Sequence, residues 1–338
     1  MKLTSRMTCG RTALVALPAS ALLCCASVGL ADDSAARGFA LRNQHPFHQL
    51  YGLPAFKSAQ LNAPGDTALE FTLDFTNHAD EGGDAGEDFR IDGETHFLTL
   101  SWRRRVANWL EVGIDVPFVS HTDGYMDNMI ESWHDLWSLS NTKRNGPSNQ
   151  LLYRYERDEL ERYFLDSSAS GLGDIQLSAA IPIREGANGK AAITVRSSVK
   201  LPTGDADKLL GSGATDFATG LYIANTRTLR QRALGIGGFA GVLVLGDGDV
   251  LRDLQRDAVV FGGLSLAWQF SERTALVSHL YAQGPYFHSD LEELGGESLQ
   301  LAVGADYRTR GGTLLRFAIV EDIAANATPD FAVHFSVK

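Results

Sequence analysis

Apolar and polar residues alternate one for one in many stretches of this chain. The alternation is clear over residues 69–75, 110–116, 193–200, 299–308 and 331–337. Successive side chains of an extended strand point to opposite faces. A period of two therefore predicts strands with one apolar and one polar face.

The same pattern, bounded by turn residues, predicts twelve strands. Most of them are ten to fourteen residues long, whereas strands of globular proteins usually have about five or six. Strands that cross a bilayer at a tilt need about nine to eleven residues. The predicted strands are 67–77, 94–105, 109–119, 171–184, 190–203, 214–227, 232–246, 257–270, 274–284, 297–308, 312–322 and 329–337.

The connections between these strands alternate in length. Short ones follow the even-numbered strands, the last connection (323–328) is intermediate, and long ones lie at 78–93, 120–170, 204–213, 247–256 and 285–296. Outer-membrane barrels have short periplasmic turns and long extracellular loops. We therefore predict an all-β fold, a transmembrane antiparallel β-barrel of about twelve strands over residues 67–338, with one long, helix-containing extracellular loop. An even strand count predicts both termini in the periplasm. A soluble periplasmic β-protein is the alternative.

The polar face of the predicted strands carries charges of both signs, and the opposite face is nearly free of charge. Aromatic residues of the apolar face lie beside short turns, as in the girdles of membrane barrels; they include Trp102, Trp268, Phe270 and Tyr307. A ring of one sign would predict ion selectivity, so the mixture indicates a salt-bridged lumen. The predicted lumen-lining residues are Glu70, Asp74, Arg103, Glu111, Asp115, Asp174, Arg196, Lys200, Asp306, Arg308 and Arg316.

The first 31 residues have the pattern of a secretory signal peptide. Three basic residues precede the apolar stretch 12–23, and a small-residue site follows at residues 29–31. Removal would leave 27 basic and 41 acidic residues, a charge of 27 − 41 = −14 against −11 for the whole chain. All three cysteines lie in this segment. An exported chain without disulfides needs another source of stability, and a closed sheet is one.

Strong acidity argues against nucleic acid as a partner, because nucleic-acid binding needs a basic face. We expect no cofactor and no metal. The partners that we expect are outer-membrane lipid and lipopolysaccharide, the barrel assembly machinery and a small apolar ligand.

The connection 120–170 is long enough to suggest a function of its own. Apolar residues recur in it at helical spacing, which predicts a loop helix over residues 125–139. Methionine and tryptophan suit an adaptable apolar contact surface. The helix either contacts ligand at the barrel mouth or only packs on the rim. Its candidate contact residues are Met126, Met129, Ile130, Trp133 and Trp137.

The N-terminal segment 32–66 precedes the first strand, and its part 43–56 is too apolar for a free tail. It either enters the lumen as a plug or packs under the barrel floor as a cap. The candidate plug residues are Pro46, Phe47, Leu53, Pro54 and Phe56.

Two further features are a possible calcium site and a possible hydrolase site. The acidic segment 80–88 has oxygen ligands that could bind calcium, but its spacing matches no known loop, and a solvated loop bridged to lipopolysaccharide by divalent ions is favoured. A hydrolase would need an oriented Ser–His pair. His121 and His134 lie near Ser120, Ser132 and Asp135, yet there is no Gly-x-Ser-x-Gly motif. We therefore expect no enzyme activity.

Several pieces resemble an uncharacterised family of Gram-negative outer-membrane proteins, the domain-of-unknown-function family 3187. They are the stretches 43–47 (Asn-Gln-His-Pro-Phe), 51–54 (Tyr-Gly-Leu-Pro) and 127–134 (Asp-Asn-Met-Ile-Glu-Ser-Trp-His). Residues 200–205 (Lys-Leu-Pro-Thr-Gly-Asp) are similar to a segment of meta-pathway phenol-degradation barrels. Many barrels end on Phe or Trp, whereas residues 335–338 are Phe-Ser-Val-Lys. The resemblance implies a fold and a location, and the second family implies uptake of apolar compounds.

Two main functional hypotheses remain open. The first is a narrow channel or uptake protein for a small apolar or aromatic molecule. The second is a structural or adhesive surface protein with a closed lumen. A membrane-embedded hydrolase is the less favoured third.

Overall fold

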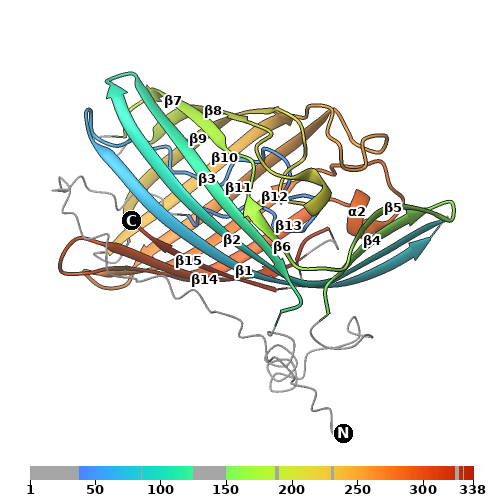
Figure 1. Cartoon of the computed structure of the whole chain (residues 1–338). Helices are drawn as coiled ribbons and strands as arrows, with labels where there is room; N and C mark the ends of the chain where they lie inside the picture. Colours follow the sequence, from blue (N-terminus) through green and yellow to red (C-terminus); the bar gives the residue numbers. More distant parts are fainter. Residues whose placement is uncertain are drawn as a thin grey trace, which may run out of the picture. The chain divides into compact units, whose positions relative to one another are not determined.

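The computed structural model describes residues 38–84, 86–124, 150–186, 190–229, 232–323, 327–329 and 331–338 (Figure 1). Strands make up most of them, and the helices are single turns, η1 (Ala206–Lys208) and α2 (Glu292–Gly295). No helix in these ranges is long and apolar enough to cross a membrane. The strands are β1 (Thr67–Asp84), β2 (Glu87–Ala107), β3 (Leu110–Thr122), β4 (Leu152–Arg157), β5 (Leu160–Leu165), β6 (Ala169–Leu172), β7 (Gln176–Arg184), β8 (Ala192–Lys200), β9 (Asp216–Leu229), β10 (Arg232–Val244), β11 (Ala258–Gln269), β12 (Thr274–Gln283), β13 (Ser298–Arg308), β14 (Leu314–Asp322) and β15 (Phe331–Val337).

Twelve of these strands close into a ring. The strands β1, β2, β3 and β7 to β15 pair antiparallel with their neighbours in sequence order. The ring closes where β1 pairs with β15, from Phe71 opposite Val337 to Asn77 opposite Phe331. A closed ring leaves no edge, and every strand has two partners. The predicted twelve-stranded antiparallel barrel is confirmed.

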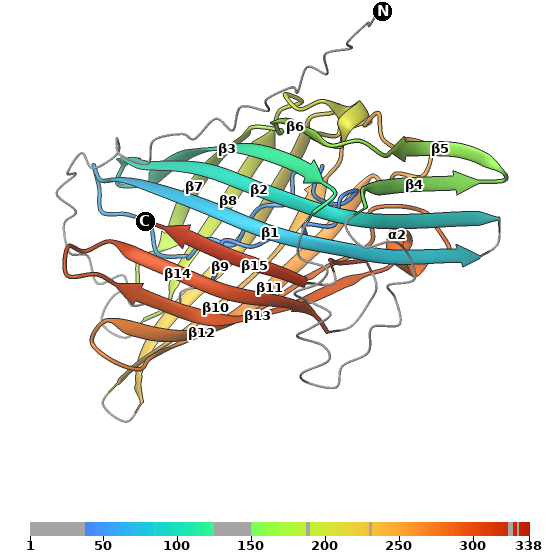
Figure 2. The same ribbon diagram turned by 60° about the horizontal axis from the view of Figure 1, so that its bottom comes forward.

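The two ends of the barrel differ (Figures 1 and 2). The short turns, the start of β1 and Lys338 gather at one end, called here the short-turn end. The long connections and the hairpin β4–β5 gather at the other, called the long-loop end. Successive connections thus lie at opposite ends of the barrel, short ones at one end and long ones at the other.

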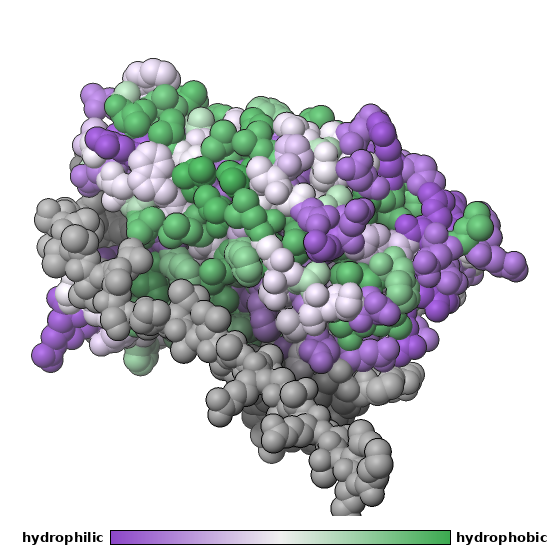
Figure 3. Space-filling view, viewed as in Figure 1, coloured by the Kyte–Doolittle hydropathy of each residue, from purple (hydrophilic) through white to green (hydrophobic). Residues whose placement is uncertain are grey.

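Burial in this barrel is the reverse of that in a soluble protein. Charged residues point inward, and the exposed fraction is 9% for Glu70 and 1% for Asp306. Large apolar residues point outward, with 68% of Val260 and 62% of Leu264 exposed. Figure 3 shows apolar residues over the barrel wall and polar residues gathered at the long-loop end. This outward face is suited to lipid hydrocarbon.

The predicted loop 78–93 is wrong, because β1 and β2 continue as a paired hairpin to Asp84 opposite Glu87. Beyond a bilayer, strands need no apolar face, so the alternation that predicts them ends before the strands do. The acidic segment 80–88 forms the tip of this hairpin.

The connection 120–170 contains more strand than the prediction allows. The hairpin β4–β5 pairs with the start of β2, and β6 pairs with the end of β3. The predicted strand 171–184 is split at residues 173–175. The carboxylate of Asp174 accepts backbone N–H groups of Gly204 (2.8 Å) and Ser212 (3.0 Å), which ties this point to the neighbouring loop.

A charge on the outward face tests the membrane assignment. Leu264 lies mid-way along β11 and Leu160 lies on β5, outside the ring, with similar exposure. In lipid vesicles, Leu264→Arg should lower the free energy of unfolding by about 2–4 kcal/mol, because a charge at bilayer depth is costly. Leu160→Arg should change it by less than about 0.5 kcal/mol. Equal effects in denaturant titrations would contradict a lipid-facing β11.

Candidate functional site: the lumenal hairpin

Residues 38–62, called here the lumenal hairpin, lie inside the barrel (Figure 1, blue trace). One leg runs to a turn at the long-loop end, where the amides of His48 and Gln49 donate to the carbonyl of His45, both at 2.9 Å. The second leg returns to the short-turn end and leads into β1. The legs are linked where the amide of Phe56 donates to the carbonyl of Leu41 at 3.3 Å.

The hairpin forms no regular strand or helix, so its carbonyl groups need partners elsewhere. Side chains of the wall supply them. In order from the turn towards the short-turn end, the donors are Lys200 to Leu50 (3.0 Å), Gln176 to Gly52 (2.9 Å), Tyr281 to Pro54 (3.0 Å), Arg196 to Ser58 (2.7 Å) and Thr194 to Ala59 (2.5 Å). Polar wall residues therefore hold the main chain of the hairpin along its second leg.

The backbone of Gly52 lies close to the wall. Its amide donates to the Asp216 carboxylate at 2.8 Å. A Cβ atom at this position would lie 3.0 Å from the Cβ of Asp216 and 3.1 Å from that of Lys200. Glycine is thus needed here for the backbone to reach the wall.

The predicted lumen-lining charges line the interior as ion pairs of mixed sign, except Asp74 and Arg308. The pairs are Arg103–Asp115 (2.6 Å), Arg196–Glu111 (3.2 Å), Lys200–Asp174 (2.7 Å), Lys200–Asp216 (3.1 Å), Arg316–Glu70 (3.3 Å) and Arg316–Asp306 (3.6 Å). Asp74 lies 2.6 Å from the Nδ1 atom of His334. Arg308 instead donates to the carbonyl of Gly312 in a short turn at 3.3 Å.

The lumenal hairpin joins these pairs through Lys57, which lies 3.2 Å from Glu70. Asn62 likewise donates to Glu111 at 2.7 Å. The alternation of apolar and polar residues does not predict the role of Lys57. Lys57 lies outside the strands, where no alternation indicates which way a side chain points.

One side of the hairpin is dry. Phe39 and Leu41 are buried in a cluster with small or apolar residues of β11 to β15, and the Phe39 ring also lies edge-on to the ring of His334, with a centroid distance of 5.6 Å. Phe56 packs on Phe239 and on the ring of His279, with centroid distances of 5.3 Å and 4.8 Å. The wall residues that cluster with Phe39 and Leu41 are Ala267, Val277, Ala302, Ala318, Val320 and Ala332.

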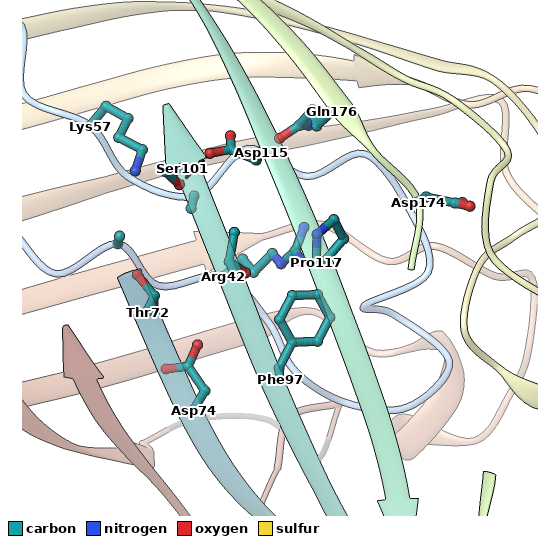
Figure 4. Close-up of a pocket in the computed structure, with 13 residues that line it drawn as sticks. Arg42, Lys57, Thr72, Asp74, Phe97, Ser101, Asp115, Pro117, Asp174 and Gln176 are labelled. Carbon is teal, nitrogen blue, oxygen red and sulfur yellow. Dashed lines mark hydrogen bonds between the residues drawn. The ribbon is translucent and has the colours of Figure 1, made fainter. Parts of the chain in front are cut away.

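The other side is polar and hollow. A cavity of about 30 Å³ separates the hairpin from the wall of β1, β2, β3 and the start of β7 (Figure 4). A second cavity, of about 10 Å³, lies nearer the long-loop end. Both cavities are bordered by Arg42, Phe97, Pro117 and Asp174. Room for one or two waters remains on this side of the hairpin.

An apolar cluster fills the long-loop end. Three of the five plug candidates, Phe47, Leu53 and Phe56, belong to it and are at most 4% exposed. Pro46 is buried and Pro54 is half-buried. Strands and long loops supply the remainder of the cluster, including Phe89, Tyr153, Tyr155, Tyr286, Phe287, Leu291 and Leu294.

The predicted loop helix, with Met126, Met129, Ile130, Trp133 and Trp137, lies outside the described residues, as do Ser132, His134 and Asp135. His121 is described and buried. Its ring nitrogens lie 2.9 Å from the Thr95 hydroxyl and 3.1 Å from the Leu209 carbonyl. In the described ranges, no three or more His, Cys, Asp or Glu residues are placed to hold a metal ion.

Residues 15–338 match the model of a family described as a protein of unknown function (DUF3187). The chain belongs to the DUF3187 family. This match confirms the resemblance seen in the sequence. A comparison with curated proteins gave no match.

Solved structures with a similar fold are outer-membrane proteins. The COG4313 outer membrane channel from Pseudomonas putida F1 is 13% identical, with a TM-score of 0.52, over 82% of this chain and 96% of that one. The toluene transporter TodX of P. putida is 9% identical (TM-score 0.37; 81% and 88%). The translocator domain of NalP from Neisseria meningitidis is 12% identical (0.36; 82% and 88%). At 13% identity, the likeness to the COG4313 outer membrane channel concerns the fold alone.

Two buried histidines form the turn of the hairpin in this DUF3187 barrel. Burial lowers the pKa of His48 to about 4, although the carbonyl oxygens of Leu294 and Ala327 lie 3.2 Å and 3.1 Å from its ring nitrogens and favour the protonated ring. Burial also lowers the pKa of His45 well below its ordinary range, and the nearby His48 adds to this effect. Both nitrogens of His45 lack a hydrogen-bond partner among the described residues, and its ring stacks on Phe89 at 5.8 Å.

These histidines predict an acid-sensitive hairpin. An unfolded histidine has a pKa of about 6.5, so their contribution to stability is complete above that pH and is lost as the pH falls towards 4. A folded barrel migrates differently from the heat-unfolded chain in a denaturing gel. The temperature at which the band of the folded barrel disappears should fall as the pH falls over this range. His45→Phe keeps the stacking and removes one titrating group, so its decline should be shallower. Parallel curves for the two proteins would contradict this role of His45.

Proposed function

We propose that this protein is a gated outer-membrane channel for a small molecule with an apolar body, and that the lumenal hairpin is its plug. One observation carries the proposal: the lumen is filled by a segment of the chain that precedes the barrel, and not by the side chains of the wall alone. A wall filled by its own side chains is permanently closed, whereas a tethered segment can move.

The contacts of the hairpin suit reversible seating. Its carbonyls accept hydrogen bonds from Lys200, Gln176 and Tyr281, and water can replace each of these bonds when the hairpin shifts. The charged residues of the wall pair with one another. Their ion pairs therefore do not depend on the hairpin, except through Lys57 and Asn62. The barrel can therefore remain folded while the hairpin moves.

The apolar cluster at the long-loop end supports an apolar cargo. A small apolar solute can partition into such a cluster from the outer side. The loop residues Met126, Met129, Ile130, Trp133 and Trp137 are then the first contact in this proposal. The solved barrels with similar folds include proteins titled as monoaromatic hydrocarbon channels. Fold likeness alone is a weak guide to cargo, and the cluster is the stronger reason.

The orientation follows from the same proposal. Residues 1–31 direct export, the assembly machinery inserts the barrel, and the short-turn end with both termini faces the periplasm. The acidic long-loop end then lies among lipopolysaccharide. No step of this proposal needs a cofactor, a metal or catalysis.

A closed structural barrel is the second candidate. The two cavities of about 30 Å³ and 10 Å³ are too small to pass a solute, which favours this reading as long as the hairpin stays seated. The two functions differ in whether displacing the hairpin opens a path.

Displacement of the hairpin tests the channel. In planar bilayers, the protein should pass little current, and deletion of residues 38–60 should open a steady conductance. Gly52→Leu should raise the open probability without shortening the chain, because the new side chain collides with Asp216 and Lys200. Cells producing the Gly52→Leu protein should also take up the apolar dye N-phenyl-1-naphthylamine faster.

Gly311→Leu is the matched control, since Gly311 lies in a short turn where an added Cβ would have no atom closer than 3.9 Å. It should leave current and dye uptake unchanged. Folded barrels that pass no current in any of these variants would sink the channel and support the structural role.

A further inference from the structure

The charges around the larger cavity are unequally matched. Three wall carboxylates border it, and each has a close partner. Asp115 accepts two bonds from Arg103, at 2.6 Å and 2.8 Å, Asp74 lies 2.6 Å from His334, and Asp174 lies 2.7 Å from Lys200. Lys57, the cation at the end of the cavity, is paired with Glu70.

Arg42 is different. It enters the cavity from the hairpin, and its guanidinium carbon lies 4.2 Å above the centre of the Phe97 ring. Figure 4 shows it between Phe97 and Pro117, directed towards the wall. Among the described residues it has no hydrogen bond and no ion pair, although its charge is attracted by Asp115 and Asp74. Its N–H donors are therefore open to a solute.

The shape of this site selects the ligand. A guanidinium that lies over a ring has its face covered and its N–H edges free, and a pair of such edges matches the two oxygens of a carboxylate. Phe97 and Pro117 offer an apolar surface beside the charge, as do Ala40 and Ala55. An ammonium ligand would have to compete with a neighbour that already holds each of the three carboxylates that border the cavity.

We propose that Arg42 is a binding site for the carboxylate of a small monocarboxylate with an apolar body. This inference rests on the proposed channel function and refines its cargo. Arg42 borders both cavities, so a solute that moves along this side of the hairpin must pass it. The space of about 30 Å³ accepts the carboxylate group, and the apolar body occupies the space that opens when the hairpin shifts.

Reversal potentials in a gradient of sodium benzoate test the site, because they give the permeability ratio of benzoate to sodium. The ratio is measured in the Gly52→Leu protein with and without Arg42→Gln. Loss of a bidentate bond to a charged group should lower it by about tenfold or more. Arg42→Lys keeps the charge but not the fork and should give an intermediate ratio. Arg162→Gln, the same change on β5 at the long-loop end, should leave the ratio unaltered.

A second measurement does not depend on conduction. The measured quantity is the temperature at which the band of the folded barrel is lost from a gel, for the protein without substitutions. Sodium benzoate should raise this temperature above its value in benzylammonium chloride at the same ionic strength. Arg42→Gln should abolish this difference. If no variant conducts but the difference is present, the channel fails and the site stands. A ratio and a thermal shift that are both indifferent to Arg42→Gln would overturn the site while leaving the channel intact.

Discussion

The whole structure depends on finding a hydrogen-bond partner for every peptide group in a place without water. In the wall this requirement is met by the ring, where β1 pairs with β15 and no strand is left with a free edge. Inside the ring it is met in a second way. The lumenal hairpin lacks regular structure, so side chains of the wall donate to its carbonyls. The polar lumen is explained by this need as much as by any solute.

This arrangement gives the two sides of the hairpin different roles. Towards β11 to β15, Phe39 and Leu41 exclude water and fix the position of the hairpin by packing. Towards β1, β2 and β3, charges and small cavities leave space between hairpin and wall. A hollow polar side and a packed apolar side thus lie on opposite faces of one segment. A plug that was packed equally on both sides would have no preferred route past it.

The sequence predicts the ring well and its contents poorly, for physical reasons. Alternation along β11 or β13 reports a lipid face and a lumen face, so strand positions and lumen charges such as Glu70 and Lys200 can be predicted. Alternation fades near the tip of the β1–β2 hairpin, at Asp80 to Gly83, so the extended hairpin is not predicted. The position of the lumenal hairpin in the barrel cannot be predicted from the sequence pattern. Many of its contacts with the wall are made by main-chain carbonyls, which every residue has. Arg42 lies in a segment without periodicity, and only the fold shows that it has no ion pair among the described residues.

The order of the segments along the chain has a consequence for folding. The lumenal hairpin is joined to β1 by residues 63–66, and β1 meets its last partner, β15, across almost the whole length of the chain. Contacts between such distant segments form late, because closing a long loop costs entropy. The hairpin is therefore made first and enclosed last. Its bonds to β8, β9 and β12 also join residues 150 to 227 positions apart, and closure of the β1–β15 seam encloses the hairpin together with these bonds.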